Sequence, residues 1–146
     1  MKETIVQPMK CVFATEGRLL VEKVGAGVGI VFFHNQSKTA AGIHVLRTLP
    51  DGTEVSNPMY YAETVIPYAL DEFKERGITA SFSIAVAGGA SLMGMSKMGD
   101  MGSKLVAAVK ETLAKANLNV KLEETGGPKI RSILLDIDAG KIKVGE

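Results

Sequence analysis

The spacing of the apolar residues in this chain changes at about residue 58, and this change restricts the folds that the chain can adopt. Beyond that point apolar side chains recur at intervals of three and four, which places them on one helix face; they are Ala62, Val65, Ile66, Ala69, Leu70 and Phe73. Before it, the apolar runs are short and rich in β-branched and aromatic residues, as in strands. Such a chain packs helix against sheet, so the pattern predicts an α/β fold.

The ends of this helix, expected over residues 58–76, carry their own signals. Ser56 or Asn57 can cap its start, Pro58 suits its first turn and Gly77 suits its end. Pro67 lies inside the helix and has no amide proton, so we expect a kink there.

The remaining runs predict strands and one more helix. That helix should begin near Asp100 or Ser103 and end at about Asn117. Several strands follow one another with hairpin-length turns, so we expect a mixed or antiparallel sheet. The predicted architecture is a layered α/β/α-type sandwich in a single domain, residues 1–146. The strands are expected at residues 19–24, 29–33, 43–46, 82–86, 133–137 and 142–144, with a short one around Val120.

Charge and hydropathy exclude several classes of protein. Lys and Arg number 17 against 16 Asp and Glu, which argues against a non-specific nucleic-acid binder. Pro8 and Lys10 interrupt the N-terminal stretch, and no window approaches the roughly 20 apolar residues of a membrane span. We therefore expect a cytoplasmic protein with no nucleic-acid partner and no membrane insertion.

The residues that commonly hold metals are few. Cys11 is the only cysteine, so neither an internal disulfide nor a thiol cluster can form. His34 and His44 are the only histidines, and neither has acidic residues at metal-binding spacing. We expect no metal and no cofactor. The Met-rich loop 93–101 is either an adaptable binding surface or a loop folded onto the core.

The glycine-rich segment 25–29 looks at first like a phosphate-binding loop. Such loops need a following helix, whose first N–H groups bind the phosphate. Here the segment continues into Ile30 and Phe33, a strand pattern, so a tight bend or bulge is favoured.

Six short segments in a fixed order together form a recognisable pattern. They are VGAGVGIVF (24–32), AGIHVLRTLP (41–50), YAETVIP (61–67), AGGASLM (87–93), MGSK (101–104) and EETGG (123–127). This set resembles the CheD family of bacterial chemoreceptor glutamine deamidases, whose members carry G-x-G-S-C, G-x-x-H-x-x-L-P, Y-A-D-T-A-I-P, F-G-G-A, I-G-x-R-N and E-D-x-G-G. The resemblance runs from about Arg18 to Val144 and implies a CheD-like fold.

The resemblance implies a thiol mechanism and its residues. In the family a cysteine thiolate attacks a receptor glutamine, ammonia leaves and water cleaves the thioester; a histidine is base and acid, and a threonine orients it. By motif position the histidine is His44, the cysteine falls on Gly29 and the threonine, six residues earlier, falls on Lys23. Glycine has no side chain, so it cannot act as a nucleophile. Losing the nucleophile lowers turnover about 10⁶-fold in serine hydrolases.

The resemblance also implies a binding surface, with changes at its edge. Lys104 and Leu105 replace the arginine and asparagine of I-G-x-R-N, and the segment after EETGG reads PKIRS. These changes fall on the surface expected to contact the receptor. The expected binding residues are Gly25, Gly27, Val28, Tyr61, Thr64, Gly88, Gly89, Gly126 and Gly127.

Three functional hypotheses follow. The first is an inactive CheD-like chemotaxis protein that binds the cytoplasmic region of a chemoreceptor or a CheC-type phosphatase. The second is a protein-glutamine amidohydrolase with a different nucleophile, for which Cys11 is a candidate. The third is a binding protein on the same scaffold with no part in chemotaxis.

Overall fold

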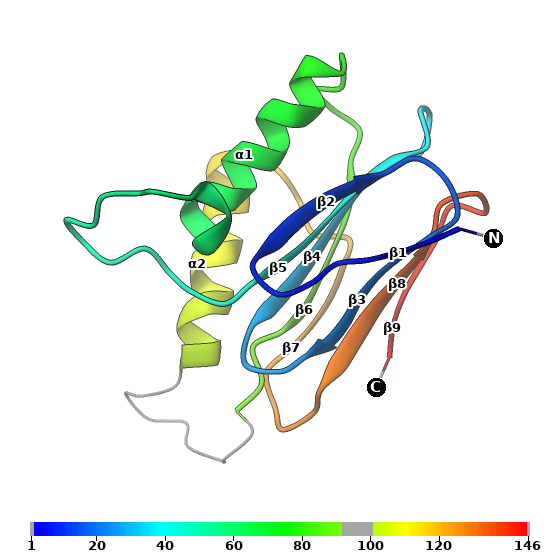
Figure 1. Cartoon of the computed structure of the whole chain (residues 1–146). Coiled ribbons are helices and arrows are strands. Elements are labelled where there is room, and N and C mark those ends of the chain that lie inside the picture. Colours follow the sequence, from blue (N-terminus) through cyan, green and yellow to red (C-terminus); the bar gives the residue numbers. More distant parts are fainter. Residues whose placement is uncertain (1, 92–100, 146) are drawn as a thin grey trace.

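The computed structural model describes residues 2–91 and 101–145, which form three layers: two helices, a five-stranded sheet and a four-stranded sheet (Figure 1). The five-stranded sheet has the order β2-β5-β4-β6-β7 and the other β1-β3-β8-β9. The strands are β1 (Glu3–Ile5), β2 (Lys10–Ala14), β3 (Arg18–Val24), β4 (Val28–His34), β5 (Thr39–Val45), β6 (Ser83–Gly88), β7 (Leu122–Thr125), β8 (Arg131–Asp136) and β9 (Lys141–Gly145). The helices are α1 (Ala62–Glu75) and α2 (Met101–Lys115), and a 3₁₀ turn spans Pro58–Tyr60.

Both sheets are mixed, as predicted. The pairs β1–β3 and β6–β7 are parallel and the other pairs are antiparallel. The α/β class is confirmed, but the third layer is a sheet where the α/β/α prediction had helices. Both helices lie on one face of the five-stranded sheet. Its other face is covered by the apolar inner faces of β3 and β8, which include Leu19, Val21, Ile133 and Leu135.

Strand β5 lies between β2 and β4 in the five-stranded sheet and is buried along its whole length. Successive strand residues point to opposite faces. Ile43 therefore packs toward the helices, whereas a side chain at Gly42 would meet Val6 and Leu19 on the side of the four-stranded sheet. Each residue of β5 is thus assigned to one of two separate cores.

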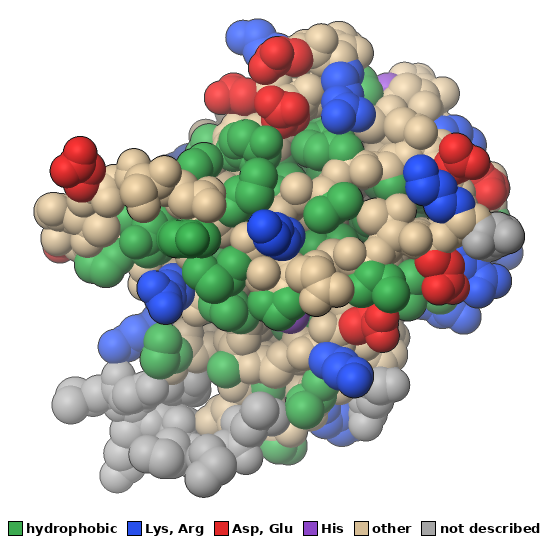
Figure 2. All heavy atoms as spheres, viewed as in Figure 1, with side chains coloured by type: hydrophobic (Ala, Val, Ile, Leu, Met, Phe, Trp, Pro, Cys, Tyr) green, Lys and Arg blue, Asp and Glu red, His purple; other side chains and the backbone are tan. Residues whose placement is uncertain are grey.

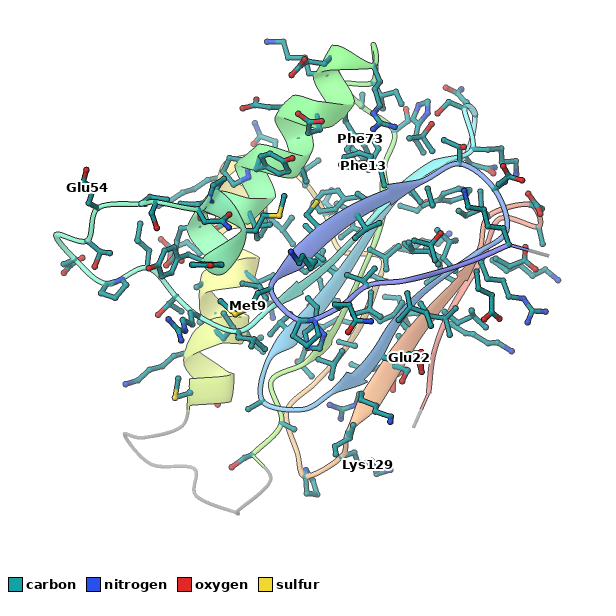
Figure 3. All side chains as sticks on the ribbon, viewed as in Figure 1. Met9, Phe13, Glu22, Glu54, Phe73 and Lys129 are labelled. Atoms are coloured by element: carbon teal, nitrogen blue, oxygen red, sulfur yellow. The ribbon has the colours of Figure 1, made fainter. Side chains whose placement is uncertain are left out.

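The two cores differ in composition. The helix-side core is built around aromatic rings: Phe73 lies 4.9 Å from Phe13 and 4.8 Å from Phe82, between ring centroids. Figure 3 labels Phe13 and Phe73 where β2 meets α1. The core between the sheets is mostly Val, Leu, Ile and Ala, with Phe33 as its only buried aromatic residue in the described ranges.

Helix α1 confirms the predicted stripe and corrects its start. The stripe is buried except for the half-buried Leu70. The helix begins at Ala62 because residues 58–60 form the 3₁₀ turn, whose cap is Asn57, with its side chain accepting a hydrogen bond from the Met59 amide. Gly77, at φ +79°, follows the helix end as expected.

Other predictions from the sequence shift by a few residues. The strand expected around Val120 begins at Leu122, and the second helix begins at Met101. The three-residue β1 carried no prediction of its own. Within residues 2–91 and 101–145, no helix combines the length and the apolar character required to cross a membrane.

Candidate functional site

His44 lies near the end of β5 and faces the core between the two sheets. Its side chain is 4% exposed, and its Nδ1 has no hydrogen-bond partner among the described residues. Burial lowers the pKa of the imidazole from its usual 6.5, because the charged form is poorly solvated there. His44 is therefore a neutral imidazole with one nitrogen unused.

Gly27, in the β3–β4 turn, and Gly29, in β4, lie on the same face of the sheet as His44, but their surroundings differ. A Cβ placed on Gly27 would lie 3.5 Å from His44 Nε2. A Cβ placed on Gly29 would have Val21, Val24 and Ile133 as its nearest neighbours, at 3.0–3.4 Å. Gly29 pairs with His44 in the β4–β5 register, but a side chain there would enter the core. The position next to the imidazole nitrogen is Gly27.

Leu46 fills the space beside Gly27. Its Cδ2 would lie 2.6 Å from the added Cβ, closer than a real contact allows, and the Val45 carbonyl oxygen would lie 2.9 Å away. A side chain at residue 27 would therefore require Leu46 to move. No sequence motif pointed to Leu46, because its packing beside a distant glycine is a tertiary contact.

Lys23, the expected threonine position, is exposed at a β-bulge in β3. The register with β8 shifts between Val21 and Val24, and the Lys23 amide donates a 3.1 Å hydrogen bond to Ser132 Oγ. Lys23 has φ +54°, a left-handed conformation that favours glycine. Val21, two residues earlier, is buried on the inner face of β3.

Cys11 and His44 lie on opposite faces of the five-stranded sheet. Cys11 pairs with Ile43, and both pack into the helix-side core. Burial, with the Glu72 carboxylate as a second cause, raises the pKa of the thiol to about 12. The sheet itself separates the sulfur from the imidazole, and the thiol remains protonated at neutral pH.

Three glycine-containing loops meet at the His44 end of the sandwich, and backbone hydrogen bonds join them. The Gly89 amide donates to the Gly27 carbonyl at 2.7 Å, and the Gly126 amide donates to the Gly88 carbonyl at 2.9 Å. The Ala90 amide donates to the Gly25 carbonyl and the Ser91 amide to the Gly127 carbonyl.

Close approach or a left-handed backbone conformation explains why these positions are glycines. A Cβ on Gly88, which has φ +120°, would overlap the Gly27 carbonyl oxygen. A Cβ on Gly89 would overlap Val106 Cγ2. Gly126 has φ +80° with open space around it, and Gly127 has φ +69°. These glycines let the loops pack together around the buried histidine.

Of the other expected binding residues, Thr64 and Tyr61 lie at the start of α1, and Val28 lies in the helix-side core. Thr64 Oγ1 donates to the carbonyls of Pro58 and Tyr61, at 2.5 and 3.1 Å. Tyr61 forms a bridge with Arg47, three residues beyond His44. Val28 is fully buried on the helix side. The structure thus brings Tyr61 near the end of β5 and assigns Val28 to packing.

Arg131 is a polar residue at this end that the sequence reasoning missed. It pairs with Val24 in the β3–β8 register, and its Nη1 is buried without a hydrogen-bond partner in the described part of the chain. The only signal was its place in the PKIRS segment after EETGG. Arg131 and His44 both bring an unused polar atom to the region around the loops.

The remaining candidates lie elsewhere. His34 is the last residue of β4, and its Nδ1 is 2.7 Å from Ser37 Oγ. Lys104 is exposed on α2, and Leu105 is buried beneath it. Of the Met-rich loop, residues 93–100 lie outside the described residues, and Met101 is 65% exposed at the start of α2. No three His, Cys, Asp or Glu side chains are grouped as metal ligands within the described ranges.

The fold and this end of the sandwich define a layered α/β protein with a buried imidazole at the end where three glycine loops meet. Residues 48–146 match the family model described as CheD chemotactic sensory transduction. The chain belongs to the CheD family.

Curated relatives cover nearly the whole chain. A protein of Clostridium botulinum (strain Alaska E43 / Type E3) named probable chemoreceptor glutamine deamidase CheD is 32% identical over 136 residues, covering 88% of this chain and 83% of the relative. The chemoreceptor glutamine deamidase CheD of Thermotoga maritima is 31% identical over 146 residues, covering 99% of this chain and 91% of the relative. These alignments extend upstream of residue 48, where the family model match begins.

Proposed function

We propose that this chain is a non-catalytic CheD protein of the cytoplasm that acts by binding other chemotaxis proteins. The observation that carries the proposal is the surroundings of His44 Nε2. Of the two glycines compared on this face, Gly27 is the one at which an added Cβ would lie beside Nε2; it has no side chain, and Leu46 Cδ2 occupies the space that a side chain would use. An imidazole without a thiol beside it cannot form the thioester intermediate.

The geometry supports a motif register two residues earlier than the one taken from the sequence. In this register G-x-G-S-C falls on residues 23–27, so the cysteine position is Gly27 and the threonine position is Val21. Lys23 then stands at the first glycine of the motif, which agrees with its φ of +54°. Both registers replace the cysteine by glycine, so the proposed loss of covalent chemistry does not depend on the choice.

The amidohydrolase alternative required another nucleophile near His44. Cys11 is on the opposite face of the sheet, and its pKa of about 12 keeps it protonated. Among the described residues, no hydroxyl or thiol forms a hydrogen bond with His44 Nδ1. These observations favour a binding role over the amidohydrolase alternative.

What supports binding is the ordered architecture around Gly27. The glycine loops are joined by backbone hydrogen bonds, and Tyr61 forms a bridge with Arg47 just beyond β5. Relatives of this chain are named for action on chemoreceptors. We propose as partners the cytoplasmic region of a chemoreceptor or a CheC-type phosphatase, bound at the loop end of the sandwich.

A gain-of-function comparison tests the account of the site. Gly27→Cys combined with Leu46→Ala should place a thiol beside His44 and produce glutamine-dependent ammonia release from receptor fragments. Gly29→Cys combined with Lys23→Thr is the matched variant for the alternative register and should stay inactive, because its thiol enters the core between the sheets. Activity only in the second variant would overturn the proposed register.

A binding measurement tests the proposed role. The wild-type protein should bind purified receptor cytoplasmic fragments or a CheC-type phosphatase in isothermal titration. Tyr61→Ala, at the loop end, should weaken binding, whereas Lys74→Ala on the exposed side of α1 should not. No binding to either protein would favour a function unconnected with chemotaxis.

A further inference from the structure

The outer face of the four-stranded sheet is uncovered in the single chain. Figure 1 shows the helices and the five-stranded sheet on one side of it and no element on the other. Ile5 on this face is 46% exposed, and Leu20 and Leu134 beside it are half-buried. An apolar row on an uncovered sheet face raises the question of what covers it.

Two rows of residues run across this face, one position from each strand in the order β1-β3-β8-β9. The strand registers place Glu3, Arg18, Asp136 and Lys141 side by side in the first row. In the second row they place Ile5, Leu20, Leu134 and Lys143 side by side. In Figure 2 acidic and basic side chains are interspersed at the right of the molecule, where this sheet lies.

The first row has charges that alternate in sign from one strand to the next. Consider a two-fold axis above this face that runs parallel to the strands, midway between β3 and β8. It would place a second copy face to face with the first, with the order of the four residues in the row reversed. Glu3 would then meet Lys141 of the other copy, and Arg18 would meet Asp136. Every charge in the row finds its opposite, which is the requirement for a self-complementary two-fold interface.

The second row fits the same operation. Leu20 of one copy would lie over Leu134 of the other, and Ile5 would lie over the aliphatic stem of Lys143. The apolar centre of the face is thus covered by the same centre of the second copy. Within the residues that the structure describes, the four charges of the first row take part in no ion pair of the single chain.

The shape of the face supports the same partner. A hollow of about 550 Å³ lies over β8 and β9, where Leu134, Asp136, Lys141 and Lys143 line it, and it reaches Lys121, just before β7 of the other sheet. Under the two-fold operation, β1 of the other copy lies over this hollow. That strand carries the exposed Ile5 and the acidic Glu3, which suit the apolar Leu134 and the lysines of this lining.

We propose that this chain forms a two-fold dimer through the outer face of its four-stranded sheet. The four strands, spaced about 4.8 Å apart, span less than roughly 20 Å. The buried area is therefore below that of a standard stable interface, and the dimer should be weak, with a dissociation constant of roughly 10⁻⁵ to 10⁻³ M. The helices and the loop end at His44 remain free for other partners.

Charge-reversal variants test this dimer in sedimentation experiments on the tag-free chain at concentrations up to about 1 mM. Glu3→Lys and Lys141→Glu should each weaken the dimer about tenfold, because each creates two like-charge contacts across the two-fold axis. Lys74→Glu on α1 is the matched control and should leave the dissociation constant unchanged.

Mixing the two variants gives the decisive result. In a mixed dimer the lysine introduced at position 3 of one copy faces the glutamate introduced at position 141 of the other, and the second contact is the original Glu3 with Lys141. An equimolar mixture of E3K and K141E should therefore restore dimer formation, whereas either variant alone should not. A monomer at the highest concentration, a dimer insensitive to both variants, or no recovery on mixing would each overturn the proposal.

Discussion

The two faces of the five-stranded sheet carry the two reactive side chains of this protein, one on each. Toward the helices, Cys11 and Ile43 pack among phenylalanine rings. Toward the four-stranded sheet, His44 lies at the end of a core of smaller aliphatic side chains. Cys11 pairs with the residue next to His44, yet the sheet lies between the two side chains.

This difference shows that register neighbours need not be chemical neighbours. Moving one residue along a strand changes the face to which the side chain points. The helix side holds a thiol without a base, and the side between the sheets holds a base without a thiol.

The largest effect is expected in the aromatic core. Phe73 contacts Phe13, Phe32 and Phe82, so Phe73→Ala should lower the free energy of unfolding by about 3–5 kcal/mol. Leu135→Ala in the other core should have a smaller effect of about 2–4 kcal/mol. Urea unfolding measures both, and a loss below about 1 kcal/mol for Phe73→Ala would contradict the helix-side packing.

The reactivity of Cys11 tests whether its thiol is isolated from any base. Its pKa is raised from 9.0 to about 12, so at neutral pH the thiolate fraction should be about 10³-fold below that of the same thiol in the unfolded chain. The rate of alkylation by iodoacetamide in the folded protein should rise steadily through pH 9. A rate that levels off below pH 7 would indicate a thiolate–imidazolium pair and reverse the comparison.

Replacing glycine by alanine should destabilise the protein by different amounts at two positions in the loops near His44. Gly88→Ala should lower the free energy of unfolding by about 2–4 kcal/mol, because its Cβ would overlap the Gly27 carbonyl oxygen and its φ is +120°. Gly126→Ala meets no atom within 4 Å and has φ +80°, so only about 1 kcal/mol is expected. Equal losses at the two sites would argue against the close packing of these loops.

The smallest effect concerns the protonation of His44. Burial lowers its pKa from 6.5, so the unfolded chain binds this proton more tightly than the folded chain. Stability should fall as pH drops below about 6.5, by no more than about 1.4 kcal/mol per pH unit. Unfolding measured between pH 5 and 8 should show this slope in the wild type and lose it in His44→Gln. The same slope in both proteins would mean that His44 is not the group involved.

Local patterns predicted the elements well and their arrangement less well. The stripe from Ala62 to Phe73 specified α1, because helical spacing is a property of neighbouring residues. The division of the strands into two sheets could not be predicted, because β4 and β5 are apolar on both faces and alternation gives no sign of which neighbour covers which face. The same ambiguity led to a second helical layer being expected where β3 and β8 lie.

At the site, sequence reasoning predicted His44 as the family histidine and a glycine at the nucleophile position, and both stay predictions. It did not resolve the motif register, because glycines at positions 25, 27 and 29 fit the pattern in more than one way. The left-handed φ of Lys23 and the proximity of Gly27 to His44 are properties of the folded structure, and no sequence pattern indicates them. Leu46 and Arg131 were missed for the same reason.

Mass spectrometry of a receptor cytoplasmic fragment after incubation with the purified protein tests the central claim most directly. Each deamidated glutamine would raise the mass of its peptide by the difference between an amide and an acid. We predict that the wild type, Cys11→Ala and His44→Ala leave the fragment equally unchanged. Conversion by the wild type that is lost in either variant would show a working nucleophile–imidazole pair and contradict the account.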